Sequence, residues 1–351
     1  MVHCKQGKMT NTLDCLSFFR VVFMLLVFFE HYPVTPLRVG GKAVCFFFVL
    51  SGFVLSYGYG MRLGAMAYKD FLVGRMVKLY PLHWVLLPIG VWIGRDFFHS
   101  TWYHLPANIF LLQSWIPDKD SYFSGNGISW FLSTTLFLYI VFPYIWRFCS
   151  RLTIRWNLVL YAALIAVRCC LEALCTGDAR IDWLYINPAT RWMDFTVGVI
   201  TFLVYKELLD NGLLKRQWHI IVCVCAIILT FVTFYVTHNT TYPLALFWLS
   251  YSFLICGSSL LEISCKAHAG GGQHGTRLIR IINWLSGISF SFYLLHQIVI
   301  LVLYNHWPVY MQDNELVKFI VILSVCLLLA YFSFRYFEKP VAIRLRTKLS
   351  R

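Results

Sequence analysis

The sequence is poor in charged residues. Asp, Glu, Lys and Arg make up 13% of its 351 residues, and 59% are hydrophobic. A soluble domain carries about 25% charged residues, roughly twice this share. The composition therefore argues against a soluble enzyme and predicts a polytopic membrane protein along almost the whole chain.

The sequence also lacks the cysteine spacings of a metal site or a disulfide framework. Its 12 cysteines lie mostly within apolar runs, and no CxxC occurs. We interpret them as small buried side chains and predict that the protein has no metal site.

Acidic residues are the minority charge, with 16 Asp and Glu against 30 Lys and Arg, a net charge of +14. The basic residues recur in short clusters between apolar runs instead of gathering in one domain. This distribution argues against nucleic-acid binding and is typical of the cytosolic loops of membrane proteins.

Ten segments are long enough to cross a hydrocarbon core of about 30 Å as helices. The stretch 104–115 is too short for a confident crossing, and no small-residue cleavage site follows the first segment, so we keep that segment as a span. The ten predicted spans are 13–32, 41–59, 76–95, 128–149, 157–175, 193–209, 219–237, 243–264, 284–304 and 316–337.

The basic loops predict the orientation. With the N-terminus in the cytosol, the outer connections include "DKD" (118–120), "HNTT" (238–241) and "QDNE" (312–315), and most Lys and Arg fall inside. This alternation requires that 104–115 does not cross the bilayer. We predict an all-α polytopic membrane protein with about ten transmembrane helices, one extra short or re-entrant segment and both termini cytosolic. We expect a single domain over 1–351 with no appended soluble domain.

Arg20 and His31 lie in the first apolar segment, with ten residues between them. Eleven steps of about 100° bring them to one helix face, about 16 Å apart along the axis. An arginine at bilayer depth costs several kcal/mol on insertion scales, so it needs a partner or a function. An imidazole is suited to general-base catalysis because it titrates near neutrality.

A structural interpretation of the same pair stays open. Arg20 would then pair with a neighbouring helix, and His31 would be a polar anchor at the membrane surface. Glu30 is about 100° away from His31 around the helix and need not touch it. Ser51 and Gly52, in the second segment, predict a close helix contact.

Seven segments, in order along the chain, have the form of known motifs. Arg20 and His31 match an Arg-x10-His motif. The other six are "VCFFFVLSGFVLS" (44–56), "RMVKLYPLHW" (75–84), "GISWFLSTTLFLYIVFP" (127–143), "RWMDFTVGVI" (191–200), "ISFSFYLLHQ" (288–297) and "FRYFEKP" (334–340). Together they resemble the motifs of acyltransferase family 3, integral membrane enzymes of bacteria that O-acylate glycans.

The sequence departs from the family pattern at three positions that bear on the site. Ser17 replaces the usual acidic residue before the first-helix arginine, and Cys45 replaces an acidic residue of the second motif. Lys78 stands for an arginine and loses its bidentate fork. We expect Asp14 to lie on nearly the same face as Arg20 and to supply the missing carboxylate.

The resemblance implies an acyl-CoA donor on the cytosolic side, with acetyl-CoA as the expected donor and no permanently bound cofactor. The CoA phosphates need cations. We predict that these are Arg75, Lys78, Arg62 and Lys69, although ordinary anchoring at the cytosolic surface explains the same residues.

At the other end of the first helix, the resemblance implies that His31 acts as the base or takes part in an acyl relay, and that Arg20 orients the donor. Ser289, Tyr293 and His296 fall at i, i+4 and i+7, a single stripe that we expect to face protein or water. We predict that this stripe, with Trp130 and Asp14, binds substrate or supports the site. The alternatives are helix–helix hydrogen bonding for His296 and an interface aromatic for Trp130. Arg191 and Asp194 are expected to pair with each other.

The sequence thus predicts a bacterial inner-membrane acyltransferase that moves an acyl group, in the first instance acetyl, from CoA to a hydroxyl of a cell-surface glycan or glycolipid. Its expected partners are acyl-CoA, a glycan or lipid-linked glycan acceptor, membrane lipids and glycan-assembly proteins, with no nucleic acid. One alternative is a transporter or flippase for an anionic lipid-linked solute, although the inverted repeats of many transporters are not evident. Another is a catalytically inactive family member that scaffolds glycan assembly.

Overall fold

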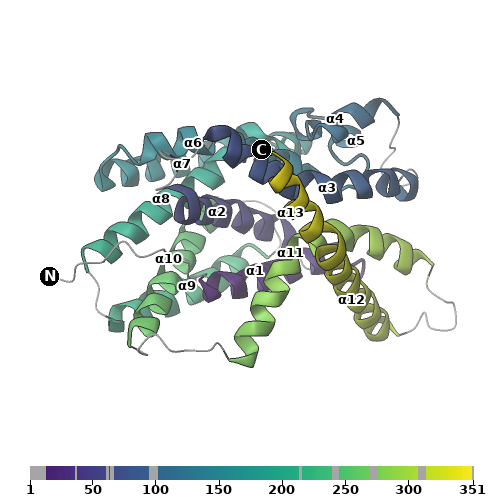
Figure 1. Ribbon diagram of the computed structural model, residues 1–351. Helices are drawn as coiled ribbons and strands as arrows, with labels where there is room; N and C mark the ends of the chain where they lie inside the picture. The colour runs from purple at the N-terminus through teal and green to yellow at the C-terminus, as the bar shows by residue number, and fades with distance from the viewer. Residues whose placement is uncertain are drawn as a thin grey trace.

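The computed structural model describes residues 13–35, 38–60, 63, 67–94, 102–212, 216–238, 245–268, 276–306 and 314–349. Over these residues the protein consists of helices and their connections, without a β-strand (Figure 1). The predicted all-α class is therefore confirmed for the described part of the chain.

Every predicted span coincides with a long helix. These helices are α1 (Asp14–His31), α2 (Gly40–Tyr59), α3 (Tyr68–Gly94), α6 (Trp130–Cys149), α7 (Ile154–Leu174), α8 (Pro188–Asp210), α9 (Arg216–Val236), α10 (Ala245–His268), α11 (Arg277–Asn305) and α12 (Glu315–Phe332).

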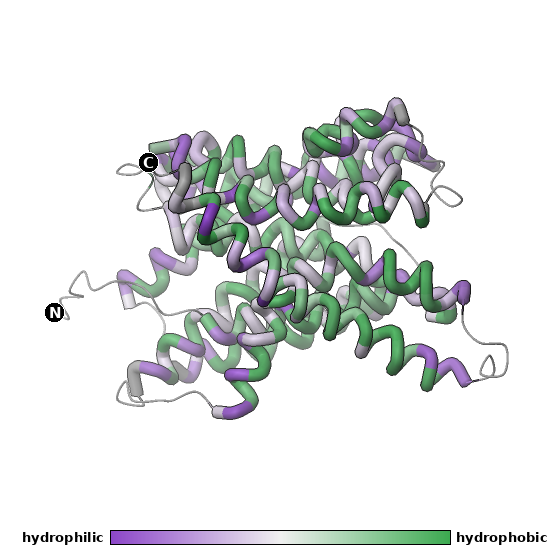
Figure 2. The backbone as a smooth tube through the Cα atoms, turned by 45° about the vertical axis from the view of Figure 1, so that its right-hand side comes forward, coloured by the Kyte–Doolittle hydropathy of each residue, from purple (hydrophilic) through white to green (hydrophobic). Residues whose placement is uncertain are grey.

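Eight of the described helices are long and apolar enough to cross a membrane: α2, α3, α6, α7, α9, α10, α11 and α12. The other two long helices, α1 and α8, carry three and five Asp, Glu, Lys or Arg residues respectively. Figure 2 shows apolar residues along most of the long helices and hydrophilic residues gathered towards many of their ends. The protein is an integral membrane protein, while the count of ten crossings and the cytosolic termini stay predictions.

The segment that was not expected to cross consists of short helices. They are η2 (Trp102–His104), α4 (Leu105–Ile109) and η3 (Gln113–Trp115), followed by α5 (Lys119–Tyr122). A five-residue helix is only about 7.5 Å long, so none of these pieces reaches across a hydrocarbon core of about 30 Å. Side chains of α3 hold the segment, because the Tyr80 hydroxyl donates to the Phe110 carbonyl and a ring nitrogen of His83 bonds the Asn108 carbonyl.

A glycine contact joins α2 to α8. A Cβ on Gly52 would lie 2.1 Å from the Phe195 carbonyl oxygen, and one on Gly198 would lie 1.9 Å from the Val49 carbonyl oxygen. No larger residue allows the two backbones to approach this closely. The close helix contact predicted at Ser51 and Gly52 is confirmed.

A buried ion pair joins α8 to its neighbours. The Arg191 Nη1 atom lies 2.9 Å from Asp194 Oδ2, and neither side chain is exposed. The Trp248 indole N–H donates to the same carboxylate, and the Cys45 Sγ atom lies 3.4 Å from Asp194 Oδ1. The predicted pairing is confirmed, and it ties α2, α8 and α10 together.

Two π-helical segments complete the chain. One is η4 (Arg180–Ile186), before α8. The other, η6 (Ser333–Glu338), continues α12 into α13 (Lys339–Leu349), the yellow end of the ribbon in Figure 1. Glu338 accepts hydrogen bonds from Ser291 and Ser333, which fastens η6 to α11.

Candidate active site

Arg20 and His31 lie in the walls of two different cavities. The cavity at Arg20, called here the arginine cavity, has a volume of about 180 Å³. The cavity at His31, called here the histidine cavity, has a volume of about 590 Å³. One helix, α1, thus contributes one predicted catalytic residue to each cavity.

The arginine cavity gathers three basic side chains from two helices. Arg20 comes from α1, and Arg75 and Lys78 come from α3. None of the described residues that line this cavity is acidic. The wall therefore favours an anionic ligand.

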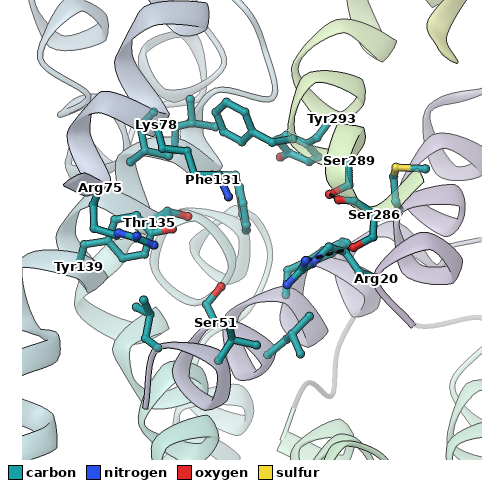
Figure 3. A pocket seen from close by; sticks show the side chains of 18 of the residues that line it. Arg20, Ser51, Arg75, Lys78, Phe131, Thr135, Tyr139, Ser286, Ser289 and Tyr293 are labelled. Carbon is teal, nitrogen blue, oxygen red and sulfur yellow. Dashed lines mark hydrogen bonds between the residues drawn. The ribbon is translucent and has the colours of Figure 1, made fainter. Parts of the chain in front are cut away.

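Arg20 reaches across to α11. Its Nη1 atom donates a hydrogen bond to Ser286 Oγ at 3.1 Å, the dashed line in Figure 3. The ion pairs among the described residues do not include Arg20. Its helix partner is a neutral hydroxyl, so the positive charge remains in the cavity wall for a ligand.

Arg75 lies on the opposite side of the cavity from Arg20 (Figure 3). Its Nη2 atom donates to the Tyr59 hydroxyl at 2.6 Å, and its guanidinium lies 4.8 Å from the centre of the Tyr59 ring. The ammonium of Lys78 lies 6.0 Å from the centre of the Phe290 ring. These contacts hold the two cations at a cavity whose described wall contains no carboxylate.

Of the other two predicted CoA-binding residues, the structure describes one, and it lies away from this wall. Lys69 is exposed on the first turn of α3 and does not line the cavity. Arg62 lies outside the described residues.

The histidine cavity has an aromatic and acidic wall. The centres of the Trp130 and Tyr185 rings lie 4.8 Å apart. Trp130, predicted as a possible substrate contact, is the first residue of α6 and lines the cavity. The charged residues in the wall are Glu30, Asp118, Asp178, Asp182 and Lys119.

Several of these carboxylates also hold the wall together. Glu30 Oε2 accepts from the backbone N–H groups of Val39 and Gly40, at 2.6 and 3.1 Å, and so caps the N-terminus of α2. The Tyr122 hydroxyl donates to Asp182 Oδ1 at 2.8 Å and joins α5 to η4. Glu30 is thus committed to α2, in agreement with its expected separation from the His31 ring.

His31 meets a second histidine. Its Nδ1 atom lies 2.8 Å from the Val27 carbonyl oxygen and 3.3 Å from His296 Nε2. The Nδ1 atom of His296 lies 2.6 Å from the Tyr293 carbonyl oxygen. His296 is buried, with 1% of its surface exposed.

The two carbonyl oxygens assign the tautomers, because a carbonyl only accepts hydrogen bonds. Each Nδ1 therefore carries a proton in the neutral rings. The His31 Nδ1–H is shared between Val27 and the lone pair of His296 Nε2, which leaves the lone pair on His31 Nε2. That lone pair is the feature a general base requires.

The predicted stripe on α11 faces the two cavities. Ser289 lines the arginine cavity and donates to the Ser286 carbonyl at 2.8 Å. Tyr293 lines both cavities, and His296 contacts His31. The expectation that this stripe faces protein or water is confirmed.

The sequence comparisons agree with this arrangement. The profile of acyltransferase family 3, described as an acyltransferase domain, matches residues 13–335. The chain belongs to acyltransferase family 3. The acyltransferase MdmB of Streptomyces mycarofaciens is 26% identical over 283 residues, which cover 75% of this chain and 68% of that protein. No solved structure shows a significant match to this family 3 acyltransferase.

Asp14 is not the carboxylate partner of Arg20 in this family 3 acyltransferase, and that prediction is wrong. Asp14 Oδ2 lies 3.1 Å from Lys266 Nζ, and Asn283 donates to Asp14 Oδ1 at 2.7 Å. Six helical steps of about 100° leave two residues about 120° apart, so Asp14 and Arg20 point to different faces. Asp14 lines neither cavity.

Several wall residues escaped the sequence analysis. Ser286 could have been found by extending the stripe of Ser289 back by one turn. Tyr122, Asp182 and Tyr185 had no such signal, because they lie in short helical segments that only the tertiary fold brings to His31.

Proposed function

We propose that the protein transfers an acyl group, in the first instance acetyl, from acyl-CoA to a hydroxyl of a glycan or lipid-linked glycan. The donor occupies the arginine cavity and the acceptor occupies the histidine cavity. The observation that carries this proposal is the pairing of a basic and an acidic–aromatic cavity along one helix, with Arg20 in one wall and His31 in the other.

The donor assignment rests on charge. CoA carries phosphates, and Arg20, Arg75 and Lys78 are the charged residues of the arginine cavity. Guanidinium groups bind phosphate oxygens through charge-assisted hydrogen bonds. Because acyl-CoA is cytosolic, this cavity takes its donor from the cytosol, with the protein in the bacterial inner membrane and both termini on the cytosolic side.

The acceptor assignment rests on the wall around His31. The rings of Trp130 and Tyr185 offer flat apolar surfaces to the faces of sugar rings, and carboxylates such as Asp182 accept hydrogen bonds from hydroxyl groups. The same carboxylates disfavour an anionic acceptor. Glycan-assembly proteins would supply the acceptor to this side.

The transfer then proceeds as a direct displacement. His31 Nε2 takes the proton of the acceptor hydroxyl while the hydroxyl oxygen bonds to the thioester carbonyl carbon. The C–S bond breaks and the leaving thiolate takes up the proton, which gives free CoA thiol and an ester. His296 holds the His31 ring in the tautomer that this step needs.

A transporter of an anionic lipid-linked solute is the rival function. An anion bound at Arg20 would next meet the cavity of Glu30, Asp118, Asp178 and Asp182, which repels it. An inactive scaffold is the other rival, and the assembled His31–His296 pair argues for an intact site.

The test compares three strains that carry wild type, His31→Ala or His306→Ala. His306 is a matched control because its Nδ1 bonds a backbone carbonyl four residues earlier, as in His31, and it lines neither cavity. Mass spectrometry of surface glycans is expected to find acetyl esters in the wild-type and His306→Ala strains and to find none with His31→Ala. Equal acetylation in all three strains, at equal membrane expression, would refute the proposal.

A further inference from the structure

Tyr293 stands between the two cavities. Among the described residues it is the one that lines both the arginine cavity and the histidine cavity. Figure 3 shows its ring beside Ser289 and Phe131 at the edge of the arginine cavity. Its side chain therefore lies where the walls of the two cavities meet.

The Tyr293 ring is buried, with 9% of its surface exposed, and one hydrogen bond anchors its hydroxyl. Its hydroxyl donates to the Ile128 carbonyl at 3.1 Å, in the connection that precedes α6. Its ring centre lies 5.1 Å from that of Phe131 and 5.7 Å from that of His296. A single neutral hydrogen bond contributes little net stability, so the bond to Ile128 by itself is a weak tether for the ring.

A barrier between the two cavities would protect the donor from hydrolysis. The arginine cavity would hold a thioester, which water can also attack. In that side reaction the water oxygen bonds to the carbonyl carbon, the C–S bond breaks, and free acid and CoA thiol are released. Excluding water until the acceptor is present prevents this loss.

We propose that the Tyr293 ring is a movable partition that separates the donor thioester from the histidine cavity and opens for acyl transfer. The inference rests on the proposed function. Tyr293 is a positioning residue. Its ring decides whether water or the acceptor hydroxyl reaches the thioester, and its own hydroxyl takes no part in proton transfer.

The test measures release of CoA thiol from acetyl-CoA by the purified protein, with no acceptor added. Tyr293→Phe keeps the ring and removes its bond to Ile128, and is expected to raise thiol release about 5-fold, the factor that about 1 kcal/mol represents. Tyr293→Ala removes the ring and is expected to raise release at least about 10-fold while glycan acetylation in cells falls. The matched control is Tyr304→Phe on the same helix, which lines neither cavity and is expected to stay within 2-fold of wild type.

A variant whose structure is generally loosened would also release more CoA thiol. The dependence of this release on His31 distinguishes general loosening from opening of the partition. If the partition opens towards His31, thiol release by Tyr293→Ala falls back when His31→Ala is added, because the attacking water loses its base. Thiol release by Tyr293→Ala that stays equally high when His31→Ala is added would overturn the proposal.

Unchanged thiol release in folded Tyr293→Phe overturns the partition even if the alanine variant does not fold. Where wild type still acetylates glycans through His31, that result leaves the proposed function standing. A wild-type protein that neither binds acetyl-CoA nor releases thiol overturns both.

Discussion

The Nε2 atom of His296 lies 3.3 Å from the Nδ1 atom of His31, although 265 residues separate them in the chain. Each Nδ1 also faces a backbone carbonyl, from Val27 and Tyr293 respectively. Two carbonyls and one histidine thus direct the free lone pair of His31 to Nε2. In the proposed transfer, this pair gives His296 a role in orienting the base.

We expect His296→Ala to lower the transfer rate constant about 10-fold with little change in the KM for acetyl-CoA. It removes an orienting contact and leaves the donor cavity intact. His31→Ala is expected to cost 10²- to 10⁴-fold, the usual share of a general base. Steady-state kinetics of purified protein with the acceptor found on the cell surface checks both values.

His296→Gln provides the control, because the amide oxygen can accept from His31 Nδ1–H as the imidazole does. It is expected to recover part of the lost rate. A glutamine variant as slow as the alanine variant would argue that His296 acts through packing alone.

The sequence predicted the helices better than the site. Apolar runs of about 20 residues have few alternatives in a membrane, so each predicted span met a long helix. Arg20 and His31 were found because both lie on one helix and one face. The contact between His31 and His296 was not predictable, since no periodicity relates residues on helices at opposite ends of the chain. The Asp14 error came from helix rotation, and Asp14 instead pairs with Lys266 on α10.

Arg75→Ala is expected to raise the KM for acetyl-CoA about 10- to 100-fold, because it removes one of three cations from the arginine cavity. Arg20→Lys keeps the charge and loses the planar fork, so we expect a smaller rise. Initial-rate measurements over a series of acetyl-CoA concentrations give the KM values.

Lys69→Ala is the matched control on the same helix, since Lys69 is exposed and lines no part of that cavity. Its KM is expected within 2-fold of wild type. If Lys69→Ala and Arg75→Ala raise the KM equally, general surface charge explains the effect and the donor assignment loses its support.

Glu262→Gln is expected to destabilise the protein by about 1 to 2 kcal/mol. Its carboxylate accepts from the backbone N–H groups of Asp14 and Cys15, at 2.9 and 2.7 Å, and so caps the N-terminus of α1. It also lies 2.5 Å from Lys266 Nζ. The amide supplies one acceptor oxygen and no charge, so it stabilises the positive end of the helix less well. Thermal unfolding in detergent measures the loss.

The control for that prediction is Glu207→Gln. Glu207 accepts from the Asn211 side chain on an exposed turn of α8 and caps no helix N-terminus. Its unfolding midpoint is expected to match wild type. Equal midpoints for both glutamine variants would mean that Glu262 does not support α1.

Gly198→Ala is expected to disrupt the contact between α2 and α8. The new Cβ would lie 1.9 Å from the Val49 carbonyl oxygen, a distance that only a backbone shift can relieve. Such overpacking costs about 3 kcal/mol or more.

Gly58→Ala, on α2 at a position with nothing within 4 Å of the new Cβ, is the matched control. Because alanine favours a helix over glycine by about 1 kcal/mol, it should be neutral or stabilising. Size-exclusion profiles after heating should therefore show a lower folded fraction for Gly198→Ala and an equal or higher one for Gly58→Ala. A Gly198→Ala protein as heat-resistant as wild type would contradict the close packing of the two helices.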